Sequence, residues 1–324
     1  MRAQARAKLN LFLRVLGRRA DGFHELETVF QSIDLADELT FTPAGDLQLT
    51  GGCDAAPPGP ENLVLRAAMA LGEHAGHAGG ASIRLEKQIP VGAGLGGGSS
   101  DAAATLVALN HLWGIDLPTG RLAELAAALG SDVPFCLQGG TAIGRGRGEL
   151  LEPLPAPGAS PSTLVPHPPS LLFVLVRPPF PVPTARAYSL YRPAPLGAPS
   201  LEAFLAAFAT GDPERLAPLL RNDLEAGVFG AWPELAALRE ELLAAGALGA
   251  RMTGSGSVLF GLASDERHAR RVAERMERPG RWVQVARAIH SGVRVFLGAR
   301  ASRPHERPGW PRSQEYPPRG ESDG

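Results

Sequence analysis

The chain has 324 residues, of which 44% are hydrophobic and 6% aromatic, with 39 glycines and 30 prolines. This composition is typical of a soluble globular protein and excludes a fibrous, membrane-spanning or wholly disordered chain, and the length predicts about two domains. The formal net charge is -1, which excludes the strong overall charge typical of nucleic-acid and membrane-surface proteins. We therefore expect no nucleic-acid or membrane partner, and an anionic ligand would need a local pocket.

Lysine is scarce in this sequence. Of the 32 Lys and Arg residues only two are lysines, Lys8 and Lys87, which leaves 30 arginines. Arginine and lysine differ in shape, hydration and ability to shift their pKa. Each remaining lysine is therefore a candidate for a specific role.

The two cysteines, Cys53 and Cys136, stand far apart and outside any metal-binding spacing. This excludes a disulfide framework and gives no sign of a zinc site. The basic N-terminal segment 1–16 is interrupted by polar residues and lacks a cleavage pattern, so we interpret it as mature protein. We expect a reducing, cytoplasmic setting.

Residues 7–16 alternate with a period of two, which predicts a half-buried strand with Lys8 and Asn10 on one face, together with Phe12 and Arg14. Further strands are expected in an early antiparallel sheet. Asn62 and the residues 99–101 are good helix-starting residues. In the N-terminal half we expect strands at 26–35, 39–42, 46–50 and 81–87, and helices at 63–73, 99–113 and 118–129, with a further helical turn from 131.

A connector rich in Pro, Ala, Ser and Gly spans residues 153–169 and predicts a domain boundary. Residues 1–152 form the predicted N-terminal domain, and residues 170–297 form a smaller α+β domain. The segment 298–324 loses its apolar residues and predicts a disordered tail. In the second domain we expect strands at 171–176, 249–253, 258–262 and 282–288, and helices at 201–209, 213–220, 233–245 and 265–276.

A glycine-dense loop, PVGAGLGGGSSD at residues 90–101, lies between a strand and a helix. Glycines let backbone amides approach phosphate oxygens, and the positive end of the following helix favours an anion. The loop therefore predicts a phosphate site. Its expected members are Pro90, Val91, Gly92, Ala93, Gly94, Leu95, Gly96, Gly97, Gly98, Ser99 and Ser100.

The same loop contains a GxGxxG pattern at Gly92, Gly94 and Gly97, which is weakly indicative of a dinucleotide-binding Rossmann unit. Asp116, the next acidic residue at a suitable distance, stands in a turn rather than at a strand end, which disfavours that unit. No GxxxxGK[ST] motif supplies a built-in lysine, so a cation must come from elsewhere. Ser99 or Ser100 either holds Mg²⁺ or simply caps the helix.

Other polar residues are ambiguous when taken singly. Lys8 could be an exposed strand lysine, Asp132 a helix cap, and His24 a turn histidine. The glycine turn TGSGS at 253–257 could be a plain tight turn or a second amide-rich cradle. Their combination is more informative than any one of them.

Six stretches together resemble the GHMP superfamily of small-molecule kinases. They are AKLNLFL at 7–13, ADGFH at 20–24, PVGAGLGGGSSDAA at 90–103, GSDVPF at 130–135, NDLE at 222–225 and TGSGS at 253–257. The resemblance covers residues 1 to about 297 and implies the two-domain α+β GHMP kinase fold, with a mixed or antiparallel N-terminal sheet. AKLNLFL with ADGFH points to the members that phosphorylate the 2-hydroxyl of 4-diphosphocytidyl-2-C-methyl-D-erythritol.

The resemblance also implies roles for individual residues. It implies ATP and Mg²⁺ as cofactors, the cytidyl-diphosphate methylerythritol as the small-molecule substrate, and Lys8 and Asp132 as the catalytic residues. No protein residue is assigned as a metal ligand, and the oligomeric state stays open. The chain departs from the family in Arg6, where Pro is common, and in Phe23, where Tyr is common. The residues implied to face the substrate are Asn10, Phe23, His24, Phe30, Thr184 and Tyr188.

Three alternatives remain at this point. The chain could phosphorylate homoserine, mevalonate or a sugar, as other members of the superfamily do. It could be a catalytically silent nucleotide sensor with the same fold, although the presence of both Lys8 and Asp132 disfavours this. An NAD-dependent oxidoreductase follows only from the bare GxGxxG pattern.

Overall fold

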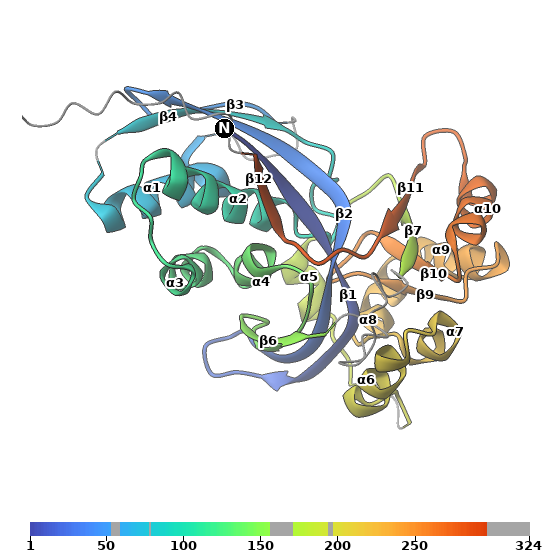
Figure 1. The fold of residues 1–324 in the computed structure, drawn as a ribbon. Helices are drawn as coiled ribbons and strands as arrows, with labels where there is room; N and C mark the ends of the chain where they lie inside the picture. Colours follow the sequence, from blue (N-terminus) through green and yellow to red (C-terminus); the bar gives the residue numbers. More distant parts are fainter. Residues whose placement is uncertain (53–58, 78, 156–170, 194–196, 297–324) are drawn as a thin grey trace, which may run out of the picture.

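The computed structural model describes residues 1–52, 59–77, 79–155, 171–193 and 197–296. Two long antiparallel strands, β1 (Arg2–Arg18) and β2 (His24–Ala44), run through the centre of the molecule (Figure 1). We predicted separate strands at 26–35 and 39–42, and this was wrong, since β2 is continuous. The strand continues because it pairs with β1 along most of its length, and three register shifts absorb the irregularities.

The N-terminal sheet is mainly antiparallel, as expected. Its central order is β12-β1-β2-β4-β3. Strand β5 pairs with β2, and β6 pairs with β5. Strand β8 pairs in parallel with the C-terminal half of β1. Strands β5, β6, β8 and β12 were not predicted; β8 and β12 are short and their partner β1 lies far away in sequence, whereas β5 and β6 pair with each other as neighbours. Besides β1 and β2, the strands of this sheet are β3 (Gln48–Gly51), β4 (Gly80–Glu86), β5 (Thr141–Gly146), β6 (Leu150–Leu154), β8 (Arg221–Asn222) and β12 (Val293–Phe296).

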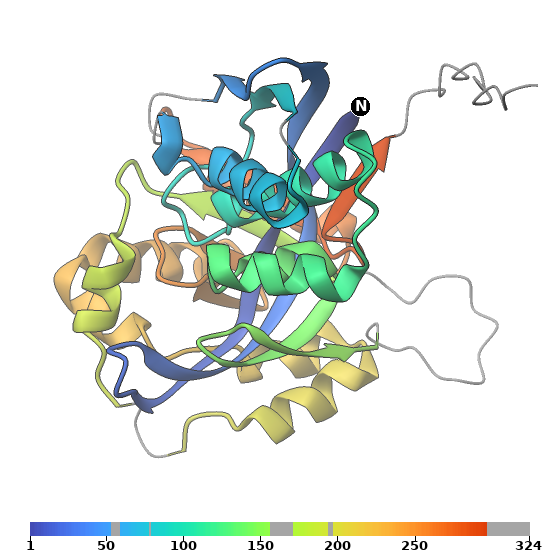
Figure 2. The same ribbon diagram turned by 90° about the vertical axis from the view of Figure 1, so that its left-hand side faces the viewer.

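Helices pack together against one side of this sheet (Figures 1 and 2). A short 3-10 turn, Gly59–Glu61, precedes the first of them, and the Asn62 side chain caps that helix as predicted, by accepting from the Val64 N–H. Alanines and leucines of the helices form one apolar cluster with Leu39 and Phe41 of β2. The helices are α1 (Leu63–Ala75), α2 (Gly97–Leu112), α3 (Thr119–Leu129) and α4 (Val133–Gln138).

The C-terminal sheet is antiparallel, with the order β11-β7-β10-β9. Its strands, β7 (Leu172–Arg177), β9 (Gly249–Met252), β10 (Leu259–Ala263) and β11 (Trp282–Arg287), confirm the four predicted ones to within two residues. Short helices α5 and α8 were not predicted. The helices are α5 (Thr184–Ser189), α6 (Leu201–Thr210), α7 (Pro213–Leu216), followed by a 3-10 turn at Ala217–Leu219, α8 (Glu225–Ala231), α9 (Pro233–Ala244) and α10 (Glu266–Met276).

The domain limits remain a prediction. Most of the predicted connector 153–169 and the whole of the predicted tail 298–324 lie outside the described residues. Strands β8 and β12 belong to the C-terminal half of the sequence, yet both pair with β1. The two halves are therefore joined through β1.

The middle of β1 is buried on both faces, so the prediction of a half-buried strand was wrong there. Leu9 and Leu11 pack with Phe173 and Phe260 of the C-terminal sheet. A register shift between Asn10 and Phe12 interrupts the alternation. Phe12 therefore packs against Phe204, with ring centroids 5.5 Å apart, instead of sharing a face with Lys8.

Helix α2 begins earlier than predicted. Gly96 is its N-cap, with φ of +71° and no side-chain cap, so Ser99 and Ser100 fall inside the first turn. The glycine loop itself turns into the helix, because glycine reaches positive φ without a steric penalty. Backbone amides at the start of α2 are thereby left for a ligand rather than for a serine cap.

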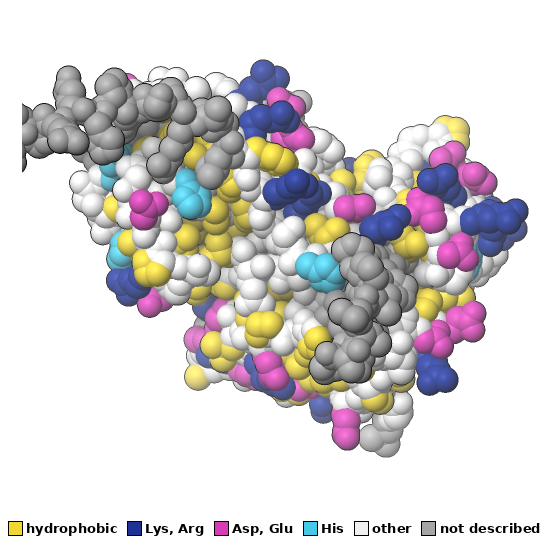
Figure 3. Space-filling model, viewed as in Figure 1, with side chains coloured by type: hydrophobic (Ala, Val, Ile, Leu, Met, Phe, Trp, Pro, Cys, Tyr) yellow, Lys and Arg dark blue, Asp and Glu magenta, His cyan; other side chains and the backbone are white. Residues whose placement is uncertain are grey.

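Charges are mixed rather than segregated on the face shown in Figure 3, where Lys and Arg side chains stand among Asp and Glu. Pairs such as Arg287 with Glu266, at 2.7 Å, and Arg281 with Glu241, at 2.8 Å, account for part of this pattern. Within the described ranges, none of the helices has the length and apolar character that a membrane crossing requires.

Candidate active site

A cavity of about 1090 Å³ opens between the two halves of the chain. It is lined by β1 and β2, by the glycine loop with the start of α2, by the residues before α4, and by α5 and the turn after β9. Every residue that the sequence placed in the site lines this cavity except Ser100. Tertiary structure thus gathers segments that are up to about 250 residues apart.

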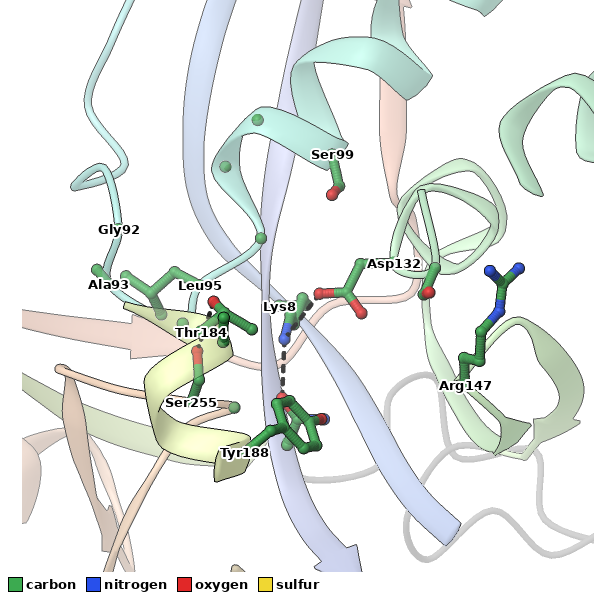
Figure 4. Close-up of a pocket in the computed structure, with 18 of the residues that line it drawn as sticks. Lys8, Gly92, Ala93, Leu95, Ser99, Asp132, Arg147, Thr184, Tyr188 and Ser255 are labelled. Atoms are coloured by element: carbon green, nitrogen blue, oxygen red, sulfur yellow. Dashed lines mark hydrogen bonds and ion pairs between the residues drawn. The ribbon is translucent and has the colours of Figure 1, made fainter. Parts of the chain in front are cut away.

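Lys8 and Asp132 meet near the centre of the cavity (Figure 4). The Lys8 Nζ lies 3.1 Å from Asp132 Oδ2 and donates to Asn10 Oδ1 at 2.8 Å, which confirms that Lys8 and Asn10 share a face. Lys8 is 4% exposed, whereas the Asp132 side chain is 32% exposed. A fixed ammonium therefore stands beside a carboxylate that a ligand can reach.

Asn10 orients Lys8 and has little hydrogen-bonding capacity left. Its Nδ2 donates to Thr28 Oγ1 at 2.9 Å, and its backbone N–H donates to Thr253 Oγ1 at 3.1 Å. The Thr28 hydroxyl donates in turn to the Phe12 carbonyl at 2.6 Å. We predicted that Asn10 faces the substrate; it lines the cavity, but its carboxamide is engaged with Lys8 and Thr28.

The glycine loop lies directly against β1. The Lys8 N–H donates to the Leu95 carbonyl at 3.0 Å, which fixes the loop beside the Lys8–Asp132 pair. A Cβ on Gly96 would lie 2.9 Å from Lys8 Cγ, and one on Gly94 would lie 2.2 Å from the Thr253 carbonyl oxygen. Both glycines also have positive φ. A side chain at either position would displace the loop from its neighbours.

The second glycine turn, 253–257, closes the other side of the cavity. The Val258 N–H donates to the Ala93 carbonyl at 3.2 Å, and Thr253 Oγ1 donates to the Gly94 carbonyl at 3.4 Å. Ser255 Oγ lies 3.0 Å from Thr184 Oγ1 of α5 (Figure 4). The two glycine turns therefore contact each other and form one continuous lining, with α5 behind them.

Aromatic rings occupy one end of the cavity. His24 stacks on Tyr188 with ring centroids 5.1 Å apart, and the exposed ring of Phe23 lies under the Arg147 guanidinium at 5.1 Å. Burial, with help from the charge of Arg18, lowers the pKa of His24. Burial, with a smaller contribution from Asp132, raises the pKa of Tyr188. Both groups are therefore held neutral, which suits contact with an uncharged base.

Phe30 lies behind the catalytic pair. Its ring centroid is 5.5 Å from Lys8 Nζ and 4.8 Å from the Phe135 ring, and the residue is 2% exposed. We predicted that Phe30 faces the substrate. It borders the cavity, but its packing with Phe135 makes it a support for Lys8, and a cation near a ring face gains electrostatic stabilisation.

The two serines at the start of α2 differ. Ser100 is buried and its hydroxyl donates to the Arg6 carbonyl at 2.6 Å, so it does not line the cavity. Ser99 does line the cavity and points from α2 towards Asp132 (Figure 4). Neither serine caps α2, and of the two only Ser99 lines the cavity.

Several lining residues were missed in the sequence. They include the two arginines Arg18 and Arg147 and the buried acid Asp101, which pairs with Lys87. Arginine occurs at 30 positions, so the residue type alone carried no signal for a site. Arg147 stands in the tight turn between β5 and β6, two strands that were not predicted either.

The chain matches two family profiles. "GHMP kinases N terminal domain" matches residues 62–140, and "GHMP kinases C terminal" matches residues 204–281. A homoserine kinase from Cytophaga hutchinsonii has the same fold, with a TM-score of 0.71 at 20% identity over 91% of this chain and 97% of its own. Together with the Lys–Asp pair between two glycine turns, these matches define the class of the protein, a GHMP kinase.

More similar proteins narrow the class. The 4-diphosphocytidyl-2-C-methyl-D-erythritol kinase of Pelotomaculum thermopropionicum is 49% identical over 89% of this chain and 98% of its own, and that of Moorella thermoacetica is 48% identical over 84% and 93%. A crystal structure of 4-(cytidine 5'-diphospho)-2C-methyl-D-erythritol kinase superposes with a TM-score of 0.73 at 42% identity, over 89% of this chain and 99% of that one. The chain belongs to the 4-diphosphocytidyl-2-C-methyl-D-erythritol kinase family.

Membership of this family and the antiparallel sheets exclude the Rossmann interpretation of the GxGxxG pattern. A Rossmann unit needs a mostly parallel, doubly wound sheet. Here the glycine loop follows β4, which pairs antiparallel with β2. The glycines therefore belong to a loop of the GHMP kinase fold and not to a dinucleotide-binding Rossmann unit.

Proposed function

We propose that this chain transfers the γ-phosphoryl group of ATP to the 2-hydroxyl of 4-diphosphocytidyl-2-C-methyl-D-erythritol, giving the 2-phosphate and ADP in non-mevalonate isoprenoid biosynthesis. The observation that carries the proposal is the Lys8–Asp132 pair, 3.1 Å apart, in a cavity that two glycine turns border. The identity of 49% to a kinase of that name supports the choice of substrate.

Phosphoryl transfer depends mainly on positioning and on stabilising charge at the transferred group. We propose that Asp132 orients the attacking hydroxyl and accepts its proton, because its carboxylate is the reachable member of the pair. Lys8 would hold the Asp132 carboxylate in place through their ion pair and offset negative charge on the moving phosphoryl group. Asn10 and Phe30 hold the ammonium in place for this task.

The glycine loop is proposed to hold the ATP phosphates. The start of α2 presents unpaired backbone N–H groups and the positive end of the helix dipole, both of which favour an anion. Gly96 and Gly97, at the helix start, line the cavity. Lys87 also borders this loop, since a Cβ built on Gly97 would lie 3.2 Å from its Nζ.

Mg²⁺ fits this site as a nucleotide-borne ion. In the described parts of the chain, no three His, Cys, Asp or Glu side chains gather into a group that could hold a metal. Mg²⁺ in kinase sites commonly keeps its waters and is held by phosphates and one or two protein oxygens. Ser99 and Asp132 are the cavity-lining oxygens that would hold it, and a bound ion would neutralise phosphate charge.

The aromatic end of the cavity is proposed to bind the cytidine. Phe23, His24 and Tyr188 supply ring faces, and a ring face suits stacking on a base. The phenylalanine at 23 keeps the ring of the tyrosine that is common in the family, without its hydroxyl. Thr184 stands between this end and the second glycine turn, through its contact with Ser255.

The test is a panel of acceptors. Purified protein is incubated with ATP and Mg²⁺ and with 4-diphosphocytidyl-2-C-methyl-D-erythritol, mevalonate, homoserine or a sugar, and ADP release is followed. We expect release with the cytidyl acceptor alone, and phosphorus NMR should place the new phosphate on the 2-hydroxyl. ADP release with another acceptor would reassign the substrate, and release with none would leave the nucleotide-sensor alternative.

A further inference from the structure

The motif Asn222-Asp223-Leu224-Glu225 has no place in the mechanism above, although all three of its polar side chains are buried. It lies between β8 and α8, about 30 residues before the second glycine turn. Burial of three polar side chains is costly unless each finds partners. The partners that they find connect the motif to the active site.

Asn222 holds the second glycine turn from behind. Its Nδ2 donates to the Met252 carbonyl at 2.6 Å and to the Gly254 carbonyl at 2.8 Å, and its Oδ1 accepts the Leu224 N–H at 3.0 Å. Both side-chain donors are thus used on the carbonyl groups of Met252 and Gly254, the two residues that flank Thr253. Glu225 adds a third contact, since its Oε1 accepts the Met252 N–H at 2.7 Å.

The turn held in this way touches the catalytic pair. Thr253 Oγ1 accepts the Asn10 N–H at 3.1 Å, and Asn10 Oδ1 accepts from Lys8. A Cβ built on Gly254 would lie 3.3 Å from Lys8 Nζ and 3.3 Å from Asn10 Oδ1. A small shift of this turn would therefore move the surroundings of Lys8 directly.

Asp223 is as buried as Asn222, but its side chain has different partners. Its Oδ2 accepts the Val15 N–H at 3.0 Å, and its own N–H donates to the Leu13 carbonyl at 2.9 Å. Arg221 neutralises it at 2.6 Å. Asp223 thus joins β8 to β1 beyond the site, without contacting the glycine turn.

We propose that Asn222 is a positioning residue, which fixes the second glycine turn so that Thr253 and Gly254 hold the Asn10–Lys8 arrangement in its working geometry. The inference rests on the proposed role of Lys8 in phosphoryl transfer. The carboxamide is specific for the task, because it offers two donors to two carbonyl oxygens. An aspartate of the same shape would offer acceptors there and would repel both carbonyl oxygens.

The test compares Asn222→Asp with Asp223→Asn, two isosteric changes at neighbouring buried positions. Melting temperature, kcat and both KM values are measured well below the melting transition. We expect both variants to melt earlier, but only Asn222→Asp to lose kcat, by at least about tenfold, because small misplacements at a reacting centre are costly. Equal kcat losses in the two variants, or an unchanged kcat in Asn222→Asp, would overturn the proposal.

A double-mutant cycle then examines the route through Thr253. Thr253→Val removes the hydroxyl that Asn10 contacts, and combining it with Asn222→Asp should cost much less kcat than the product of the two single losses, because both changes act on one turn. If the double variant loses kcat by the full product of the two single losses, Asn222 does not act through Thr253. If Asn222→Asp does not fold, Asn222→Ala takes its place in both experiments.

The experiments separate the two proposals. A wild-type protein that phosphorylates none of the acceptors would refute the proposed function. An active wild type whose Asn222 variant keeps full kcat would refute only the positioning role.

Discussion

The two lysines of this chain are both buried beside carboxylates, yet their surroundings differ. Lys8 faces one carboxylate, Asp132, whose side chain is 32% exposed in the cavity. Lys87 faces two, Asp37 at 2.5 Å and Asp101 at 2.7 Å, whose side chains are 0% and 4% exposed. We call the first cluster open, because its carboxylate is partly exposed, and the second closed, because both of its carboxyl groups are buried, although Lys87 and Asp101 also border the cavity.

The side chains of the closed cluster connect three segments of the N-terminal half. Asp37 of β2 also accepts the N–H groups of Gln88 and Ile89, so it ties β2 to the segment that leads into the glycine loop. Asp101 lies near the start of α2, just after its first turn. Lys87 therefore connects β2, the loop and the helix, whereas Lys8 has a partner that a ligand can reach. The two lysines are similarly buried, and they differ in the exposure of their carboxylate partners.

The largest effect is expected at the open cluster. Asp132→Asn and Lys8→Arg should each lose at least about 100-fold in turnover, the usual size of acid–base and charge-stabilising contributions. Arginine fails because its planar fork cannot replace a compact ammonium at this position. ADP release gives the rates, and nucleotide titration checks that ATP still binds. Near-normal turnover in both variants would remove Lys8 and Asp132 from the mechanism.

At the closed cluster we expect the loss to appear in stability. Lys87→Met leaves the buried acids Asp37 and Asp101 without their cation, and breaking a buried ion pair typically costs about 3–5 kcal/mol of unfolding free energy. The matched change Lys8→Met should cost less, since water can reach Asp132 when its partner is removed. Urea unfolding of both variants provides the comparison. An equal loss of stability in the two would show that the open and closed clusters do not differ in this respect.

A smaller effect concerns pH. Burial raises the pKa of the Asp101 carboxyl from 3.8 to about 8, with Lys87 opposing the rise and Asp37 adding to it. The folded protein then holds a proton that the unfolded chain releases, so stability should fall as pH rises from about 4 to about 8.

Asp101→Asn removes the carboxyl group that carries this proton. The decline in unfolding free energy across that window should be shallower in the variant than in the wild type, as measured by urea unfolding at several pH values. Asp132→Asn serves as the control and should keep the wild-type slope. A slope that Asp101→Asn leaves unchanged would place the proton on another group.

Much of the fold was predictable from local patterns. The period-two alternation of 7–16 predicted β1, Asn62 predicted the start of α1, and the strands of the C-terminal sheet were predicted to within two residues. What local patterns missed was β2 as a single strand and the short strands β8 and β12. These depend on pairing with β1, from partners up to about 290 residues away, and short strands carry little periodic signal of their own.

The site was predictable where residue type and motif coincide. The glycine loop, Lys8, Asp132 and the aromatic residues near His24 were all expected from the sequence, and all line one cavity. The exposure of Ser99 rather than Ser100 to the cavity, and the packing of Phe30 beside Lys8, were not. Both depend on which side chain the packed neighbours leave accessible.

The sequence by itself determined the residue types: a glycine loop suited to an anion, one lysine and one aspartate in family motifs, and a charge balance that requires a local site for an anionic ligand. Only the tertiary structure decided which of the two lysines has an exposed carboxylate partner, and that Asn222 holds the turn beside it. The physical reason is that local sequence sets backbone preference and side-chain type. Burial, partner and charge balance arise only when distant segments pack together.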